Sequence, residues 1–302
     1  MSEQIAPLAS YYGSPGLKAP VWTWEVPAYF FVGGTAGAAA LIGAVARRTG
    51  ARDTLVRDAR WIAAAGAALS PPLLISDLGR PERFLNMLRV VKLRSPMSVG
   101  VWTLVAFSTA AGATAFADLA HDATGGRVAV RIVADAAGML SAATGLVLST
   151  YTGVLLGATA IPVWSTNATW LPVHFGASGL GAAISMLELL GHRERALNRL
   201  GIGSALVETA MAAHIAMSED PAMRAIKDGQ PGALARAAGI LSGPVPLLLR
   251  VLVGRSTSAR RVAALSTIAG SVLTRAAWVA AGKSAGAVDQ AMATSSARVP
   301  MP

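Results

Sequence analysis

The chain has 302 residues, of which 53% are hydrophobic and only 14% are charged, and its formal net charge is +10. Soluble domains carry roughly 25% charged residues, so this composition indicates a polytopic membrane protein. The positive charge does not indicate nucleic-acid binding, because Lys and Arg are scattered between apolar segments and form no continuous basic face. The chain has no cysteine, which excludes disulfides, thiolate metal sites and an iron–sulfur cluster bound by this chain.

Eight apolar segments approach the length of about 20 residues that crosses a bilayer. They lie near residues 26–46, 61–78, 98–118, 132–157, 173–191, 201–217, 237–254 and 262–282. Residues 1–20 are polar and do not form a signal-peptide pattern. We therefore expect an all-α integral membrane protein with eight transmembrane helices. Its three parts are an extracytoplasmic segment (1–25), a membrane domain (26–282) and a C-terminal tail (283–302).

Proline and small residues predict how these spans bend and pack. The second span contains Pro71-Pro72 and the seventh contains Pro244 and Pro246, so both are expected to kink, with neighbouring helices bonding the freed carbonyls. Small residues recur at close-packing spacing in the pairs Gly33 with Gly37, Gly153 with Gly157, and Ala177 with Gly181. Such pairs are typical of helix contacts in membranes.

The distribution of Lys and Arg predicts the orientation, because cytoplasmic loops are enriched in both. With the N-terminus outside, the inner loops hold thirteen basic residues and the outer segments hold eleven. Five of the outer eleven lie in one stretch, residues 76–102, and the other six give a bias of 13 to 6. Both termini are therefore predicted to be extracytoplasmic, in a multi-pass plasma-membrane protein. The stretch 76–102 breaks the rule, so we expect its charge to have a local function.

Tryptophan is distributed as unevenly as charge. In this topology Trp61 lies at the inner face, and six tryptophans lie at the outer face: Trp22, Trp24, Trp102, Trp164, Trp170 and Trp278. Anchoring at the membrane interface normally populates both faces. The asymmetry favours an outer face that docks a partner or encloses a flat ring, with chance plus anchoring as the alternative.

Ionisable side chains inside spans are costly and are therefore candidates for function. Asp135, Glu188, Glu208 and Arg275 lie in spans four, five, six and eight. These four residues could form buried ion pairs or a proton path, and the sequence does not decide between the two roles. Glu208 is a candidate partner for Arg275. No span holds a pair of the four histidines, so a multihaem site is not expected, and no metal site is predicted.

Four segments together resemble a known family. They are WEVPAYFFVGGTAGAA at 24–39, SDLGRPERFLNMLR…SPMSVGVW at 76–102, YTGVLLGATAIPVW at 151–164 and GSVLTRAAWVAAG at 270–282. These segments resemble the NrfD/polysulfide reductase membrane-subunit family. The resemblance covers spans one to five and span eight, and the motif at 77–102 is its most specific part.

The resemblance implies an eight-helix anchor arranged as two four-helix bundles, with no haem or iron–sulfur cluster of its own. It implies a quinone-reactive subunit that exchanges electrons between menaquinone or ubiquinone and a partner iron–sulfur subunit. That partner is commonly joined to a molybdopterin catalytic subunit. Among such complexes we favour one of the formate dehydrogenase type.

The resemblance places the quinone site between the start of span one and the outer half of span four, which carries over to Trp24, Glu25 and Tyr151. Asp77 and His174 are added because the topology puts them at the same level. Some relatives carry His or Asn near the position of Glu25, so the proton donor is expected to differ in this chain.

The basic side chains of the stretch 76–102 suggest a docking surface. Arg80, Arg83 and Arg89 are expected to face acidic groups of the partner, or Arg80 to pair with Asp77 and fix the turn. A secondary transporter is the alternative function, because transporters share proline-broken spans and buried charges. Proton translocation through the buried ionisable residues is a further alternative.

Overall fold

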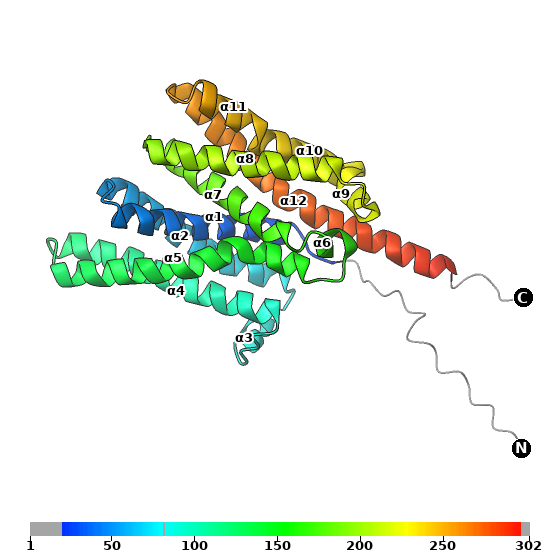
Figure 1. The fold of residues 1–302 in the computed structure, drawn as a ribbon. Coiled ribbons are helices and arrows are strands. Elements are labelled where there is room, and N and C mark those ends of the chain that lie inside the picture. Colours follow the sequence, from blue (N-terminus) through cyan, green and yellow to red (C-terminus); the bar gives the residue numbers. More distant parts are fainter. Residues whose placement is uncertain (1–19, 81, 297–302) are drawn as a thin grey trace, which may run out of the picture.

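The computed structural model describes residues 20–80 and 82–296, with side chains up to residue 287, and this part of the chain is helical, without strands. The long helices run side by side in one bundle (Figure 1). The long helices are α1 (Glu25–Arg48), α2 (Asp53–Asp77), α4 (Pro96–Ala123), α5 (Val128–Gly157), α7 (Trp170–Leu189), α8 (Arg195–Met217), α10 (Gly229–Ser242) and α12 (Thr257–Ser296). The shorter ones are α3 (Glu82–Met87), α6 (Pro162–Ser165), η2 (Pro221–Met223), α9 (Arg224–Lys227) and α11 (Pro244–Leu252).

Seven helices in the described residues are long and apolar enough to cross a membrane, with α10 and α11 together forming one of them. Each of the eight expected spans corresponds to a helix, but α2 is not among the seven. Its sequence explains this result, because α2 carries charged residues at both ends and Pro71-Pro72 in its interior. The expectation of a multi-pass helical membrane protein is thus confirmed.

The two ends of the bundle differ in composition. At one end α1, α4 and α7 begin, α2, α5 and α8 end, and α3, α6 and α9 lie across the long helices (Figure 1). We call it the tryptophan end, because Trp22, Trp24, Trp164 and Trp170 lie there. The opposite end carries the short connections, and we call it the arginine end after Arg47, Arg60, Arg193, Arg250 and Arg260. The last helix, α12, runs the whole length and extends past the tryptophan end (Figure 1).

The helices pack in two groups along the chain. In the N-terminal group α1 packs against α2 and α5, and α4 packs against α5 and α2. In the C-terminal group α7 packs against α8 and α12, and α10 and α11 pack against α12 and α8. Helix α7 contacts both α1 and α5, and it joins the two groups.

Glycine brings these helices close together. A Cβ atom on Gly37 of α1 would clash with the backbone carbonyl of Gly145 on α5. A Cβ on Gly153 would lie 2.5 Å from the backbone of Leu171, and one on Gly157 would lie 2.7 Å from Cα of Ala168. The predicted close packing is confirmed for these glycines, whereas Gly33 has room for ordinary contacts.

Replacing Gly37 with Ala is expected to destabilise the protein by about 1–3 kcal/mol, since overpacking forces the backbone to shift. The measurement is denaturant unfolding of the purified protein in detergent micelles. Gly112→Ala is the matched control, because no atom lies within 4 Å of a Cβ built there. The control should be neutral or stabilising, since Ala is the better helix former. Equal stability of the two variants would contradict the packing argument.

A neighbouring helix satisfies a carbonyl that proline frees. Pro71 has no N–H, so the carbonyl of Ala67 loses its helical donor. The Ser108 hydroxyl on α4 donates to that carbonyl at 3.1 Å. In the seventh expected span the chain breaks at Gly243, between α10 and α11, and the Ser266 hydroxyl on α12 donates to Leu241 O at 2.6 Å. The Ala67 contact confirms for the second span that a neighbouring helix bonds the freed carbonyl, whereas Leu241 is bonded next to the helix break and not opposite a proline.

Candidate functional site

A single threonine joins two carboxyl groups at the tryptophan end. The backbone N–H of Thr23 donates to Asp77 Oδ1 at 3.1 Å, and its hydroxyl lies 2.9 Å from the same oxygen. The same hydroxyl also contacts Glu25 Oε2. Asp77 ends α2 and Glu25 begins α1, so the start of the first helix is tied to the end of the second.

The number of protons available limits this arrangement. A hydroxyl has one proton to donate, so Thr23 cannot donate to both carboxylates. Asp77 already accepts the Thr23 N–H and is suited to accept the hydroxyl proton as well. The hydroxyl can therefore donate to Glu25 or to Asp77, but not to both at once. The Glu25–Thr23–Asp77 group thus brings two carboxyl groups to one hydroxyl at the exposed end of the bundle.

Tyr151 lies near the tryptophan end of α5, where its hydroxyl donates to the carbonyl of Pro96 at 2.7 Å. The ring is 6% exposed and packs on Gly100 of α4, where a Cβ would clash with the ring. The absence of a side chain at Gly100 thus positions the tyrosine. Trp24, also expected in the quinone site, is 70% exposed.

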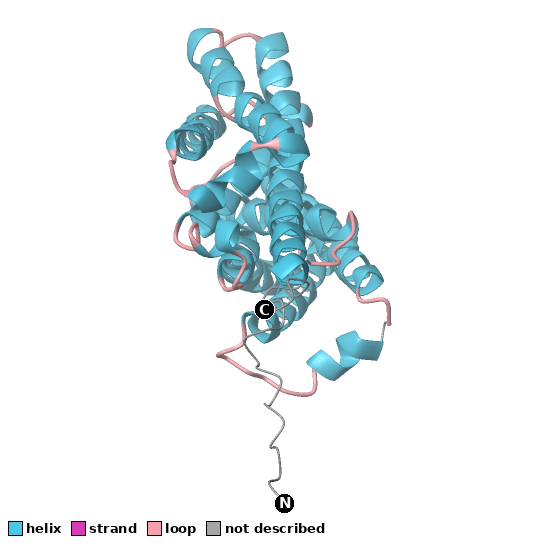
Figure 2. Ribbon diagram, turned by 90° about the vertical axis from the view of Figure 1, so that its right-hand side faces the viewer, coloured by secondary structure: helices cyan, strands magenta, loops and turns pink. Residues whose placement is uncertain are grey.

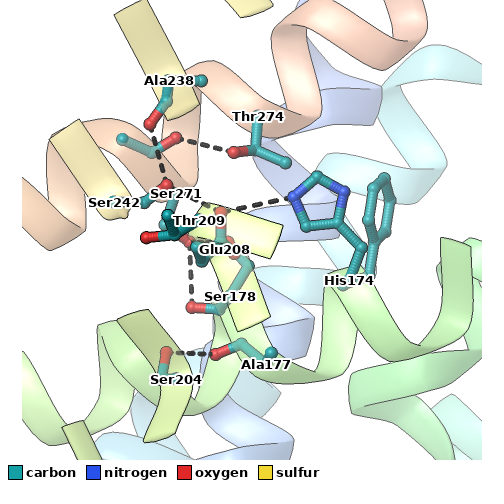
Figure 3. A network of polar contacts seen from close by, with 12 residues as sticks. His174, Ala177, Ser178, Ser204, Glu208, Thr209, Ala238, Ser242, Ser271 and Thr274 are labelled. Carbon is teal, nitrogen blue, oxygen red and sulfur yellow. Dashed lines mark hydrogen bonds and ion pairs between the residues drawn. The ribbon is translucent and has the colours of Figure 1, made fainter. Parts of the chain in front are cut away.

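His174 does not join this group but lies in a buried network of the C-terminal helices (Figure 3). Its Nε2 lies 3.2 Å from Oε2 of Glu208 on α8, and the Ser242 hydroxyl donates to the same oxygen at 2.6 Å. The side chains of His174 and Glu208 are 6% and 1% exposed. Three helices, α7, α8 and α10, therefore meet at one carboxylate.

The bonding partners of His174 define its tautomer. The indole N–H of Trp278 lies 3.3 Å from His174 Nδ1, and an indole nitrogen can only donate. Nδ1 must then accept, which leaves Nε2–H to donate to Glu208. The other oxygen of Glu208, Oε1, is buried and has no hydrogen-bond partner within the described part of the chain.

A cavity of about 20 Å³ lies against His174 and Glu208, which is room for a single water molecule. It shares lining residues, among them Ala212, Ile226 and Gly239, with an apolar groove of about 560 Å³ between α8 and α10. The carboxylate is thus separated from the membrane-facing groove by a few small side chains.

Aromatic rings connect the surface of the tryptophan end to His174. Trp22 stacks on Trp164 with ring centroids 5.3 Å apart, and the Trp164 indole donates to the backbone carbonyl of Trp278 at 2.8 Å. Trp278 then contacts His174. Trp164 and Trp278 are both buried, whereas Trp24 and Trp170 are 70% and 49% exposed, so part of the tryptophan asymmetry is internal packing and part is surface.

Arg275 is fully buried on α12 but does not pair with Glu208, so the expected pairing is wrong. It donates to Ser178 and Ser271 and to the carbonyl of Phe175 at 3.0 Å, and its guanidinium lies 5.1 Å from the Phe175 ring centroid. Hydroxyl, carbonyl and aromatic groups take the place of the carboxylate around the guanidinium.

The two other carboxylates singled out in the sequence, half-buried Asp135 and buried Glu188, form ion pairs at the arginine end. Asp135 accepts from Arg47 at 3.1 Å and from Arg60 at 2.7 Å. Glu188 accepts hydrogen bonds from both terminal nitrogens of Arg250 at 2.8 Å. A terminal nitrogen of Arg260 lies 2.5 Å from Glu188 Oε1. Of the alternatives for Asp135 and Glu188, this geometry favours ion pairs over a proton path.

A model of the NrfD family, described as polysulfide reductase, matches residues 8–290. The chain belongs to the NrfD family. No curated protein matches the chain. NrfD proteins are quinone-interacting membrane subunits of molybdopterin and iron–sulfur oxidoreductases, and this chain is accordingly a multi-pass membrane protein. The match includes spans six and seven, which the motifs alone did not cover.

The NrfD motif at 76–102 forms a protrusion at the tryptophan end that contains α3 (Figures 1 and 2). Arg80, Arg83 and Arg89 are exposed on it. The expected pairing of Arg80 with Asp77 is wrong, because Asp77 is bonded to Thr23. Leu85 and Leu93 are 65% and 82% exposed on the same protrusion, which therefore presents both positive charge and apolar surface.

Several residues of this NrfD protein that bond the candidate site residues were not among those predicted for the site. Ser242, Trp278 and Thr23 complete the two polar centres, and Arg60 and Arg250 neutralise the buried carboxylates. Arg250 could have been found as a charge that follows the apolar run of span seven. A serine or threonine in an apolar helix gives no such signal.

Proposed function

We propose that this NrfD protein passes electrons between a partner iron–sulfur subunit and the membrane quinone pool, with a formate dehydrogenase-type complex as the favoured assembly. The observation that supports the proposal is the Glu25–Thr23–Asp77 group, in which one threonine contacts two carboxyl groups at the tryptophan end. The family supplies the chemical class, and the lack of cysteine means that electrons reach quinone directly from the partner's cluster.

Reduction of a quinone to a quinol consumes two electrons and two protons, so its oxygens need proton donors as well as hydrogen bonds. Glu25 would donate one proton towards a quinone oxygen and itself take the negative charge, and the second proton would come from water at this exposed end. Asp77 would hold Thr23 in place. The Tyr151 hydroxyl would turn from the Pro96 carbonyl to bind an oxygen, and Trp24 would cover the ring. These four residues come from the ends of α1, α2 and α5 and lie where the partner is expected to dock.

His174 belongs to a separate proton-exchanging centre with Glu208. The bond from His174 occupies Glu208 Oε2, whereas Oε1 has no partner in the described residues, and Glu208 lines the cavity. We place this centre in proton exchange with the groove between α8 and α10, and we assign Arg275 to holding α7 and α12 together.

The proposal includes a membrane arrangement. We infer that α2 is an eighth span, that the two helix groups are four-helix bundles, and that the tryptophan end is extracytoplasmic. The same topology places both termini outside. Residues 26–282 would then form the membrane domain, flanked by the segments 1–25 and 283–302.

The exposed arginines of the α3 protrusion provide a test of partner docking. Changing Arg80, Arg83 and Arg89 together to Gln is expected to reduce the recovery of the iron–sulfur subunit at least about fivefold, because charge pairs set the rate and register of docking. The measurement is a pull-down in mild detergent with quantitative mass spectrometry. The control replaces Arg48, Arg52 and Arg57, three exposed arginines of the opposite end. Equal recovery with both variants would remove the docking assignment.

A further inference from the structure

A basic pocket lies at the arginine end of the C-terminal helices, between the start of α8, the end of α11 and the start of α12. Its volume is about 900 Å³, which is within the range of roughly 300–1,000 Å³ for ligand pockets. Six of its lining residues are arginines: Arg193, Arg195, Arg199, Arg250, Arg255 and Arg260. None of the pocket-lining residues is acidic.

Most of this positive charge has no carboxylate partner. Glu188 is bonded by Arg250 and Arg260, which accounts for two of the six arginines. Within residues 20–80 and 82–287, no ion pair joins Arg195, Arg199 or Arg255 to a carboxylate. Glu194 stands at the N-cap position of α8, where its side chain makes no cap bond and both its carboxylate oxygens lack partners in the described residues, but it does not line the pocket. The pocket thus has an excess of charge that an anion of more than one negative charge would neutralise.

Buried polar atoms in the pocket wall also lack partners. Arg250 is 2% exposed, and its two terminal nitrogens are bonded to Glu188, but its Nε has no hydrogen-bond partner in the described residues. Buried donors without a partner are rare and call for an acceptor. Guanidinium groups bind phosphate oxygens in paired hydrogen bonds, so the wall is chemically suited to phosphate.

The surroundings indicate that the phosphate belongs to a lipid. The pocket lies at the end of the membrane span Gly229–Leu252 and at the start of the span Arg195–Met217. Leu248, Val251 and Leu252 of α11 are 56%, 59% and 74% exposed on the adjoining helix surface. An amphiphile would place its head group in the basic pocket and its acyl chains along these side chains. A soluble nucleotide or free phosphate would leave the apolar surface uncovered.

We propose that the pocket formed by α8, α11 and α12 at the arginine end binds an anionic phospholipid whose head group carries two phosphates. Arg195, Arg199 and Arg255 would bind the outer phosphate, and Arg250 the inner one. Basic pockets between transmembrane helices are suited to such head groups. The bound lipid would also hold α11 against α8 beyond the helix break at Gly243.

The test uses the full-length protein purified in mild detergent. Diphosphatidylglycerol, phosphatidylglycerol, phosphatidylcholine and inorganic phosphate are titrated separately, and bound lipid is counted by native mass spectrometry alongside thermal unfolding. We expect one tightly held diphosphatidylglycerol and a rise in the unfolding temperature. Arg195→Gln with Arg199→Gln should weaken its binding at least about tenfold, which corresponds to roughly 1.4 kcal/mol.

Arg48→Gln with Arg52→Gln removes the same charge from exposed positions of the other helix group and serves as the matched control. It should bind the lipid as the unchanged protein does. Both changed pairs are exposed, so unfolding without lipid should be the same in each variant, which separates binding from folding. Equal lipid binding by both variants would overturn the proposal. So would an equal thermal shift with inorganic phosphate, since that outcome indicates a site for a soluble anion.

Discussion

Changing Glu25 to Gln and Tyr151 to Phe together is expected to lower quinone reduction at least about tenfold, because a positioned proton donor contributes roughly 10²–10⁴-fold to a rate. Glutamine keeps a polar contact with Thr23 but cannot supply the proton. Phenylalanine keeps the packing on Gly100 and removes only the hydroxyl. The measurement is quinone reduction by the natural electron donor in membranes that contain the assembled complex.

The controls separate this loss from a failure of assembly. Glu82→Gln removes an exposed carboxylate of the same end and should leave turnover unchanged. Thr23→Val should reproduce part of the loss, because it removes the hydroxyl that joins Glu25 to Asp77. Recovery of the iron–sulfur subunit should be equal in all variants. Unchanged turnover in the double variant, with normal assembly, would refute the quinone site at the start of α1.

Replacing Glu188 with Gln is expected to destabilise the protein by about 3–5 kcal/mol, the usual cost of removing one partner from a buried ion pair. Glu188 holds both Arg250 and Arg260, and its side chain is 2% exposed. The change leaves two guanidinium groups in the bundle without their carboxylate. Denaturant unfolding of the purified protein in detergent measures the effect.

Asp53→Asn is the matched control for this ion cluster. Asp53 also contacts two arginines, Arg47 and Arg131, but its side chain is 77% exposed. Exposed ion pairs contribute roughly 0–1 kcal/mol, so the control should change stability by no more than that. Similar losses of stability in the two variants would show that burial does not determine how much Glu188 contributes to stability.

Apolar periodicity and length were sufficient to predict the helices, because a bilayer requires every backbone group to be bonded within a helix. The close packing at Gly37 of α1, which lies against α5, was also predicted from the spacing of small residues. The partners of Arg275 did not, since a buried arginine can be satisfied by hydroxyl and carbonyl oxygens that appear in sequence as ordinary serines and backbone.

The quinone-site residues show the same limit. The resemblance marked Trp24, Glu25 and Tyr151, and the topology added Asp77, but the link between Glu25 and Asp77 through Thr23 depends on contacts that no spacing rule encodes. His174 was grouped with them by its depth in the membrane. Depth does not distinguish the two helix groups, and the structure places His174 with Glu208 in the other one.

The position of Arg60 on α2 has a consequence for the order in which the helices assemble. Arg60 lies near the start of α2, and its partners are Asp118 on α4 and Asp135 on α5. The Ser108 hydroxyl that bonds the Ala67 carbonyl also comes from α4. During synthesis α2 therefore emerges before the groups that bond it. Its polar contacts are complete only when α5 has been made, so the first helices would assemble as a set rather than one at a time.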